Sequence, residues 1–100
     1  MAKKITREEE ALIPAFQSRR EALRWFRDKY GDDFRWVSTE VSEDGMYYFC
    51  ALILNKEEYE AGVQELQYGD PFAGTFDGRA FLESFQQIEI YKGGRIHIVH

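Results

Sequence analysis

Nine consecutive uncharged residues lie at the centre of this sequence: Met46-Tyr47-Tyr48-Phe49-Cys50-Ala51-Leu52-Ile53-Leu54. They include neither Gly nor Pro, so no residue of the run interrupts a strand. A strand with one face in water alternates apolar and polar side chains, whereas this strand is apolar on both faces and needs cover on both. In a chain of 100 residues such cover is scarce, and we expect a second protein chain to supply part of it.

The residues before this run predict its partner strand. Residues 34–41 alternate in polarity and Asp44-Gly45 is a strong turn signal, so we predict a β-hairpin over about 34–54. Pairing Glu43 with Met46 sets its register. One apolar face then lies beneath the helices, with Val37, Thr39 and Val41 against Leu52, Cys50 and Tyr48. The opposite face is mixed, with Trp36, Ser38 and Glu40 against Ile53, Ala51 and Phe49.

Three helix starts are marked by a side-chain oxygen followed three residues later by Glu, an arrangement that satisfies the free amides of a first turn. The pairs are Thr6 with Glu9, Ser18 with Glu21 and Asn55 with Glu58. They predict helices over about 7–13, 18–30 and 56–67. Gly62 lies on the apolar side of the third helix, so we expect that helix to approach the sheet closely there.

The C-terminal part predicts a fourth helix and a second hairpin. Apolar residues at helical spacing favour a helix over about 78–86, with a hairpin as the alternative for 71–86. A Gly93-Gly94 turn between alternating segments predicts a hairpin over about 88–99, with His97 opposite Ile90. We therefore predict one α+β domain over residues 1–100, with an antiparallel sheet built from two hairpins and packed with two to four helices.

Composition and charge limit the class of protein. Apolar content of 44% and a single cysteine are typical of a globular protein without disulfides. The chain opens with charged residues and its longest apolar run is too short to span a bilayer, so we expect a cytoplasmic protein without membrane contact. The net charge of −5 is uneven: residues 1–36 carry nine Lys/Arg against seven Asp/Glu, and residues 37–100 carry four against eleven.

Candidates for catalysis or metal binding are few. His97 and His100 lie three residues apart on a predicted strand, so they point to opposite faces and cannot hold one metal ion together. Cys50 lies in the most apolar run, where a thiolate is disfavoured. No titratable side chain has an evident partner at a useful spacing, so we predict neither catalysis nor a metal or other cofactor. An enzyme would have to use Cys50 or His97.

Aromatic residues make up 16% of the chain, and with the acidic remainder they favour binding of another protein. One predicted surface is an acidic strip: Glu40, Glu43, Asp44, Glu57, Glu58 and Glu60. The other is an aromatic face: Trp36, Tyr47, Phe49, Ile53, Tyr91 and Ile96. Exposing that face would leave a large apolar patch, which predicts a two-fold homodimer.

The predicted role is that of an inhibitor or adaptor. Size and acidity resemble those of small inhibitors and accessory proteins from mobile genetic elements, and an acidic strip would compete with nucleic acid for the basic groove of an enzyme.

A basic face on the second helix predicts an alternative function. Arg20, Arg24 and Arg27 recur at helical spacing, and Trp25 or Trp36 could stack on a base, as in nucleic-acid-binding proteins. The negative net charge disfavours this alternative, because such proteins usually carry a basic surplus.

Overall fold

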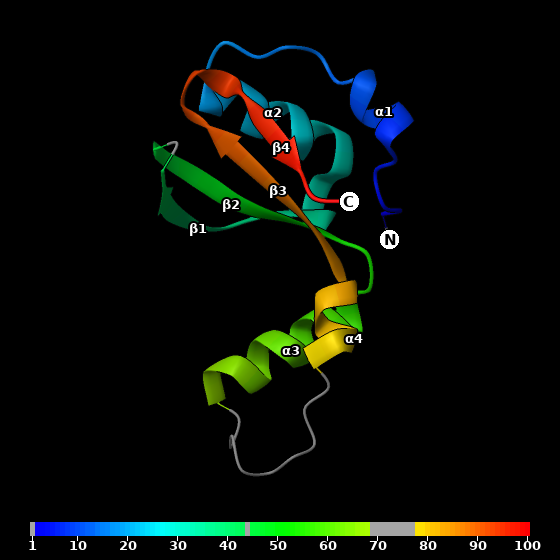
Figure 1. Ribbon diagram of the computed structural model, residues 1–100. Coiled ribbons are helices and arrows are strands. Elements are labelled where there is room, and N and C mark those ends of the chain that lie inside the picture. Colours follow the sequence, from blue (N-terminus) through cyan, green and yellow to red (C-terminus); the bar gives the residue numbers. More distant parts are fainter. Residues whose placement is uncertain (1, 44, 69–77) are drawn as a thin grey trace.

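A four-stranded antiparallel sheet forms the centre of the computed structural model, which describes residues 2–43, 45–68 and 78–100 (Figure 1). The strands lie side by side in chain order: β1 (Phe34–Ser42), β2 (Gly45–Ile53), β3 (Phe85–Tyr91) and β4 (Ile96–Ile98). The helices are α1 (Arg7–Ala11), α2 (Arg19–Tyr30), α3 (Lys56–Tyr68) and α4 (Gly78–Glu83), with short 3-10 turns η1 (Gly31–Asp33) and η2 (Lys92–Gly94). The predicted α+β fold with two antiparallel hairpins is confirmed. Within the described ranges, none of the helices combines the length and the apolar character that crossing a bilayer requires.

Side-chain caps begin the first three helices, as the sequence predicts. The Thr6 hydroxyl accepts from the Glu9 N–H at 3.1 Å, and the Glu9 carboxylate accepts from the Thr6 N–H at 3.4 Å. Ser18 and Asn55 accept in the same way from amides three residues later, at 3.1 Å and 3.2 Å. These caps satisfy donors that a first helical turn leaves free.

The fourth helix is shorter than predicted. Residues 78–83 are helical, which excludes the alternative hairpin for them, whereas residues 71–77 lie outside the described residues. β3 already begins at Phe85, because from Gln86 onward buried side chains recur at every second residue. Period-two burial fits a strand and not a helix.

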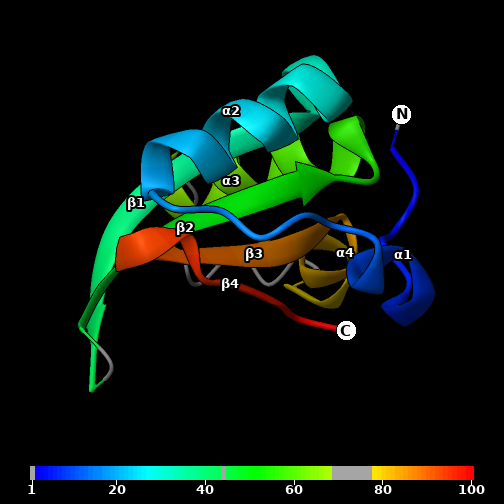
Figure 2. The same cartoon turned by 90° about the horizontal axis from the view of Figure 1, so that it is seen from above.

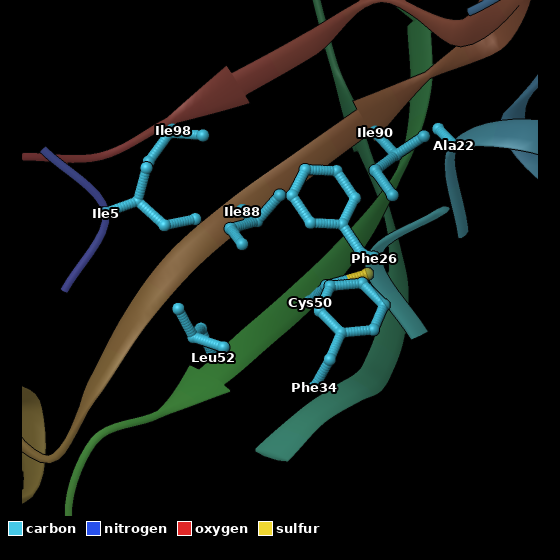
Figure 3. Packing of buried hydrophobic residues seen from close by; sticks show 9 residues of the cluster. All are labelled: Ile5, Ala22, Phe26, Phe34, Cys50, Leu52, Ile88, Ile90 and Ile98. Carbon is cyan, nitrogen blue, oxygen red and sulfur yellow. The ribbon is translucent and has the colours of Figure 1, made fainter. Parts of the chain in front are cut away.

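One face of the sheet is covered by α2, and we call it the α2 face (Figure 2). Nine buried residues from the strands, α2 and the N-terminal segment form its core (Figure 3): Ile5, Ala22, Phe26, Phe34, Cys50, Leu52, Ile88, Ile90 and Ile98. The rings of Phe26 and Phe34 stack with their centroids 5.2 Å apart. This cluster is the main hydrophobic core.

The N-terminal segment is tied to this core through Gln86. The backbone N–H of buried Ile5 donates to Gln86 Oε1 at 2.7 Å, and Gln86 Nε2 donates to the Ile5 carbonyl at 3.1 Å. The same nitrogen donates to the Val99 carbonyl at 3.2 Å. Further along, Glu10 lies 2.6 Å from His100 Nε2, and α1 lies near the C-terminal end of the chain in both views (Figures 1 and 2). The first and last segments are therefore joined through β3.

The opposite face of the sheet is covered at one end only. Ala51 and Ile53 are buried there against Tyr59 of α3, with Phe81 and Phe85 packed around them. The expected approach of Gly62 to the sheet is wrong. A Cβ at Gly62 would lie 2.8 Å from the Cβ of Phe81, so the close approach is between α3 and α4. The remainder of this face carries mostly polar and aromatic side chains.

The predicted register of the first hairpin is wrong at its turn. Ser42 pairs with Gly45, whereas we expected Glu43 to pair with Met46. Gly45 has φ 106°, a left-handed value that glycine adopts without strain, which allows the chain to reverse earlier. The observed pairs next to the turn are Val41 with Met46, Glu40 with Tyr47 and Thr39 with Tyr48.

A β-bulge then moves Trp36 to the other face. The register shifts between Trp36 and Ser38, so that Trp36 pairs with Cys50 and Val37 is the extra residue. One extra residue reverses the faces of all residues beyond it. Trp36 therefore lies on the α2 face and not on the mixed face that we predicted for it.

The second hairpin is also displaced, by one residue. Its loop contains Lys92–Gly94 and is closed by a hydrogen bond of 2.8 Å from the Tyr91 N–H to the Arg95 carbonyl. His97 consequently pairs with Glu89 and not with Ile90. The slip gathers the isoleucines of both strands on the α2 face: Ile88, Ile90, Ile96 and Ile98.

Candidate functional site

The structure divides the predicted acidic strip. Glu40 and Glu43 lie near the turn of the first hairpin, whereas Glu57, Glu58 and Glu60 lie in the first turns of α3. Strand β2 separates these positions (Figure 1), a length of about 26 Å at about 3.3 Å per residue. Glu60 also pairs with Arg35, at 3.7 Å. Asp44 lies outside the described residues.

The predicted aromatic face is divided as well. Tyr47, Phe49, Ile53 and Tyr91 share the face opposite α2, but α3 and α4 bury Ile53. Trp36 and Ile96 lie on the α2 face, where Ile96 packs against the core. Much of the apolar surface on which the homodimer prediction depended is therefore covered within one chain.

Exposed apolar side chains concentrate on the first hairpin. Of the seven large apolar residues that are exposed in the described part of the chain, four belong to β1 and β2. We call these four the hairpin strip: Trp36, Val37, Val41 and Met46. Val41 and Met46 form a cross-strand pair with 83% and 49% of their surfaces exposed. They lie beyond Tyr47, the last residue of β2 that pairs with β3.

A groove of about 360 Å³ lies between α2 and β1, at the base of this strip. It is lined by Arg20, Leu23, Arg24, Arg27, Asp28 and Trp36. The five α2 residues share one side of the helix because they recur at intervals of three and four. The bulge brings Trp36 to this side of β1, so the groove joins the basic face predicted on the helix with an aromatic ring.

The cationic side chains of the groove differ from neighbouring cations of α2 in the contacts that they make within the chain. Arg19 lies over the Tyr48 ring at 4.7 Å and Lys29 over the Trp25 ring at 5.0 Å, so these two are engaged within the chain. By contrast, the side chains of Arg20, Arg24 and Arg27 make no ion pair, hydrogen bond or ring contact with any described residue. Their guanidinium groups are available to an external anion.

A polar cluster on the opposite face is centred on Glu89, a residue that the sequence analysis missed. Its carboxylate accepts from Gln87 Nε2 at 2.7 Å and from the Tyr91 hydroxyl at 3.1 Å, and lies 2.9 Å from His97 Nδ1. Burial raises the pKa of Glu89, but these hydrogen bonds together outweigh burial and leave the pKa below its ordinary value of 4.5.

His97 therefore has a carboxylate partner, contrary to our prediction that no titratable group has one. The one-residue slip of the second hairpin hid this pair, because Glu89 and His97 face each other only in the observed register. The Glu89 side chain is 13% exposed and that of His97 61% exposed, so the ring lies at the surface and not in a cleft. The contact links β3 to β4.

Cys50 lies in the main core, as the apolar run predicts. Burial raises the pKa of its thiol to about 12, although the Arg27 charge opposes this. Such a thiol is a poor nucleophile near neutral pH. Among the described residues, no three His, Cys, Asp or Glu side chains gather as a metal ion would require.

Comparisons with known proteins give no further indication of function. No family model matches the sequence, and no curated protein or solved structure matches it.

Proposed function

We propose that this chain works in the cytoplasm by binding another protein, as an inhibitor or adaptor, and that the hairpin strip is the contact surface. The observation that carries the proposal is the concentration of four exposed apolar side chains on one hairpin. Exposed apolar side chains gathered on one element are typical of interaction sites.

The chemistry around the strip supports this role. Tryptophan and methionine are enriched in protein interfaces, and a polar rim usually surrounds the apolar centre. Glu43 follows β1 two residues after Val41, so an acidic rim lies at the turn end of the strip, whereas the Glu40 side chain points to the opposite face. Burying the Val41 and Met46 side chains in a complex would contribute up to about 1.5–3 kcal/mol each. The acidic rim would favour a partner with basic groups.

Paired baits test the proposal. The wild-type chain and the variant Val41→Ser/Met46→Ser are immobilised and exposed to native extract, and retained proteins are compared by mass spectrometry. We expect at least one protein to be retained by the wild type and lost with the variant. It should also elute as salt rises, because the acidic rim contributes charge attraction.

Leu12→Ser is the matched control, because Leu12 is as exposed as Val41 (83%) but lies outside the strip. This control should retain the same protein as the wild type. Identical sets of proteins on all three baits would contradict the proposal.

A further inference from the structure

We propose that the groove between α2 and β1 is a binding site for single-stranded nucleic acid, in which Trp36 stacks on a base and Arg20, Arg24 and Arg27 contact phosphates. This site shares Trp36 with the hairpin strip, but it does not depend on protein binding by the strip.

The Trp36 ring is held in place with one part exposed. Its Nε1–H donates to the Ser38 carbonyl at 2.9 Å, and the ring packs against Tyr48 with centroids 5.1 Å apart. The residue is nevertheless 52% exposed. Because the only polar group of the indole is already satisfied, the ring can offer a ligand its π-surface, and a nucleic-acid base is a flat group that stacks on such a surface.

The arginines supply the second half of the site. All three line the groove with Trp36, and their side chains make no ion pair, hydrogen bond or ring contact with the described residues. Arg20 and Arg27 are seven residues apart on one helix side, which spans about 10 Å at 1.5 Å per residue. A row of free guanidinium groups beside an aromatic ring matches the phosphate–base alternation of a single strand.

The acidity of the remaining chain does not prevent such binding. Charges further away than the Debye length, about 8 Å at physiological ionic strength, are largely screened. Among the described residues, Asp28 is the one acidic residue that lines the groove, and three arginines line it as well. The local charge of the groove is therefore positive although the whole chain carries −5.

Fluorescence anisotropy with labelled oligo(dT) and oligo(rU) tests the site. The wild type should bind at low salt, with Trp fluorescence quenched on binding. Arg24→Ala/Arg27→Ala should weaken binding and reduce the slope of log K against log salt by about 1.4, since each lost phosphate contact of a single strand removes about 0.7. Lys3→Ala/Lys92→Ala loses the same charge at exposed positions outside the groove and should bind as the wild type does.

Trp36 variants separate stacking from charge. Trp36→Leu should lower the affinity roughly 5- to 150-fold, whereas Trp36→Phe should retain most of it because a phenyl ring also stacks. Thermal unfolding shows whether each variant is folded. If Trp36→Leu does not fold, Arg24→Ala/Arg27→Ala still tests the site. Val41→Ser/Met46→Ser should leave oligonucleotide affinity unchanged, which distinguishes this site from the part of the hairpin strip next to the turn.

Three outcomes would overturn the proposal. One is a wild type that binds neither oligonucleotide at low salt. Another is an equal loss of affinity in Arg24→Ala/Arg27→Ala and in Lys3→Ala/Lys92→Ala, which would show that charge attracts the oligonucleotide without a specific site. The third is displacement of the oligonucleotide by poly-glutamate at equal charge concentration, which would show that the groove takes acidic peptides.

Discussion

At the scale of single residues, Glu89 shows how one carboxylate can stabilise the sheet in a pH-dependent way. Its pKa is lowered in the folded state, so ionised Glu89 stabilises the fold above the ordinary value of 4.5. This contribution is lost as pH falls through the lowered folded-state pKa. At neutral pH we expect Glu89→Gln to reduce the free energy of unfolding by about 1–2 kcal/mol, since charged acceptors form the stronger hydrogen bonds.

Urea unfolding followed by Trp fluorescence measures this effect. The difference between wild type and Glu89→Gln should shrink as pH falls below 4.5 and through the lowered folded-state pKa of Glu89, because protonated Glu89 and glutamine are both neutral. Glu83→Gln, in an exposed i, i+4 pair with Arg79, is the control and should show a much smaller difference throughout. A constant difference for Glu89→Gln across this range would contradict the proposed role of its charge.

At the scale of secondary-structure elements, the contact between α3 and α4 depends on Gly62. Alanine at this position would gain about 1 kcal/mol of helix propensity, but its Cβ would collide with Phe81. Overpacking costs about 1–3 kcal/mol, so we expect Gly62→Ala to destabilise the chain by up to about 2 kcal/mol. In a Phe81→Gly background, which also removes the Cβ of Phe81, the same substitution should instead stabilise the chain, and a double-mutant cycle in urea would show this. Destabilisation of similar size in both backgrounds would contradict the predicted collision.

Also at this scale, the existence of the elements was predictable but their pairing was not. Caps such as Thr6 with Glu9 and the period of the apolar residues are local signals, and they predicted every helix and both hairpins. Register depends on turn geometry, and neither the bulge next to Val37 nor the three-residue loop after Tyr91 has a local signal of this kind. The basic side of the groove was therefore predictable from residues 20, 24 and 27, whereas the position of Trp36 within it and the pair of Glu89 with His97 were not.

At the scale of the whole molecule, the homodimer remains a prediction, and fewer exposed apolar residues support it than the sequence suggested. The covered residues Ile53 and Ile96 no longer support it, and among the described residues the hairpin strip holds four of the seven exposed large apolar side chains that two copies could share. Light scattering at micromolar concentration should give about twice the 11.8 kDa of one chain, and Val41→Glu should restore the mass of one chain. Leu12→Glu should leave the doubled mass unchanged. A wild-type mass of 11.8 kDa that persists on concentration would contradict the dimer while leaving the protein-binding proposal intact.

The hydrogen bonds between Ile5 and Gln86 have a consequence for folding of the chain during its synthesis. These two residues are 81 positions apart, yet the Gln86 side chain satisfies the backbone N–H and carbonyl of Ile5 within the same core. On a ribosome that adds about 5–20 residues per second, Ile5 emerges many seconds before β3 and β4 exist to receive it. Until then the N-terminal segment and α2 present their apolar sides to the cell without a sheet to cover them. The last strands complete the core, so a stall or truncation before residue 98 would release a chain that chaperones and proteases recognise as unfinished.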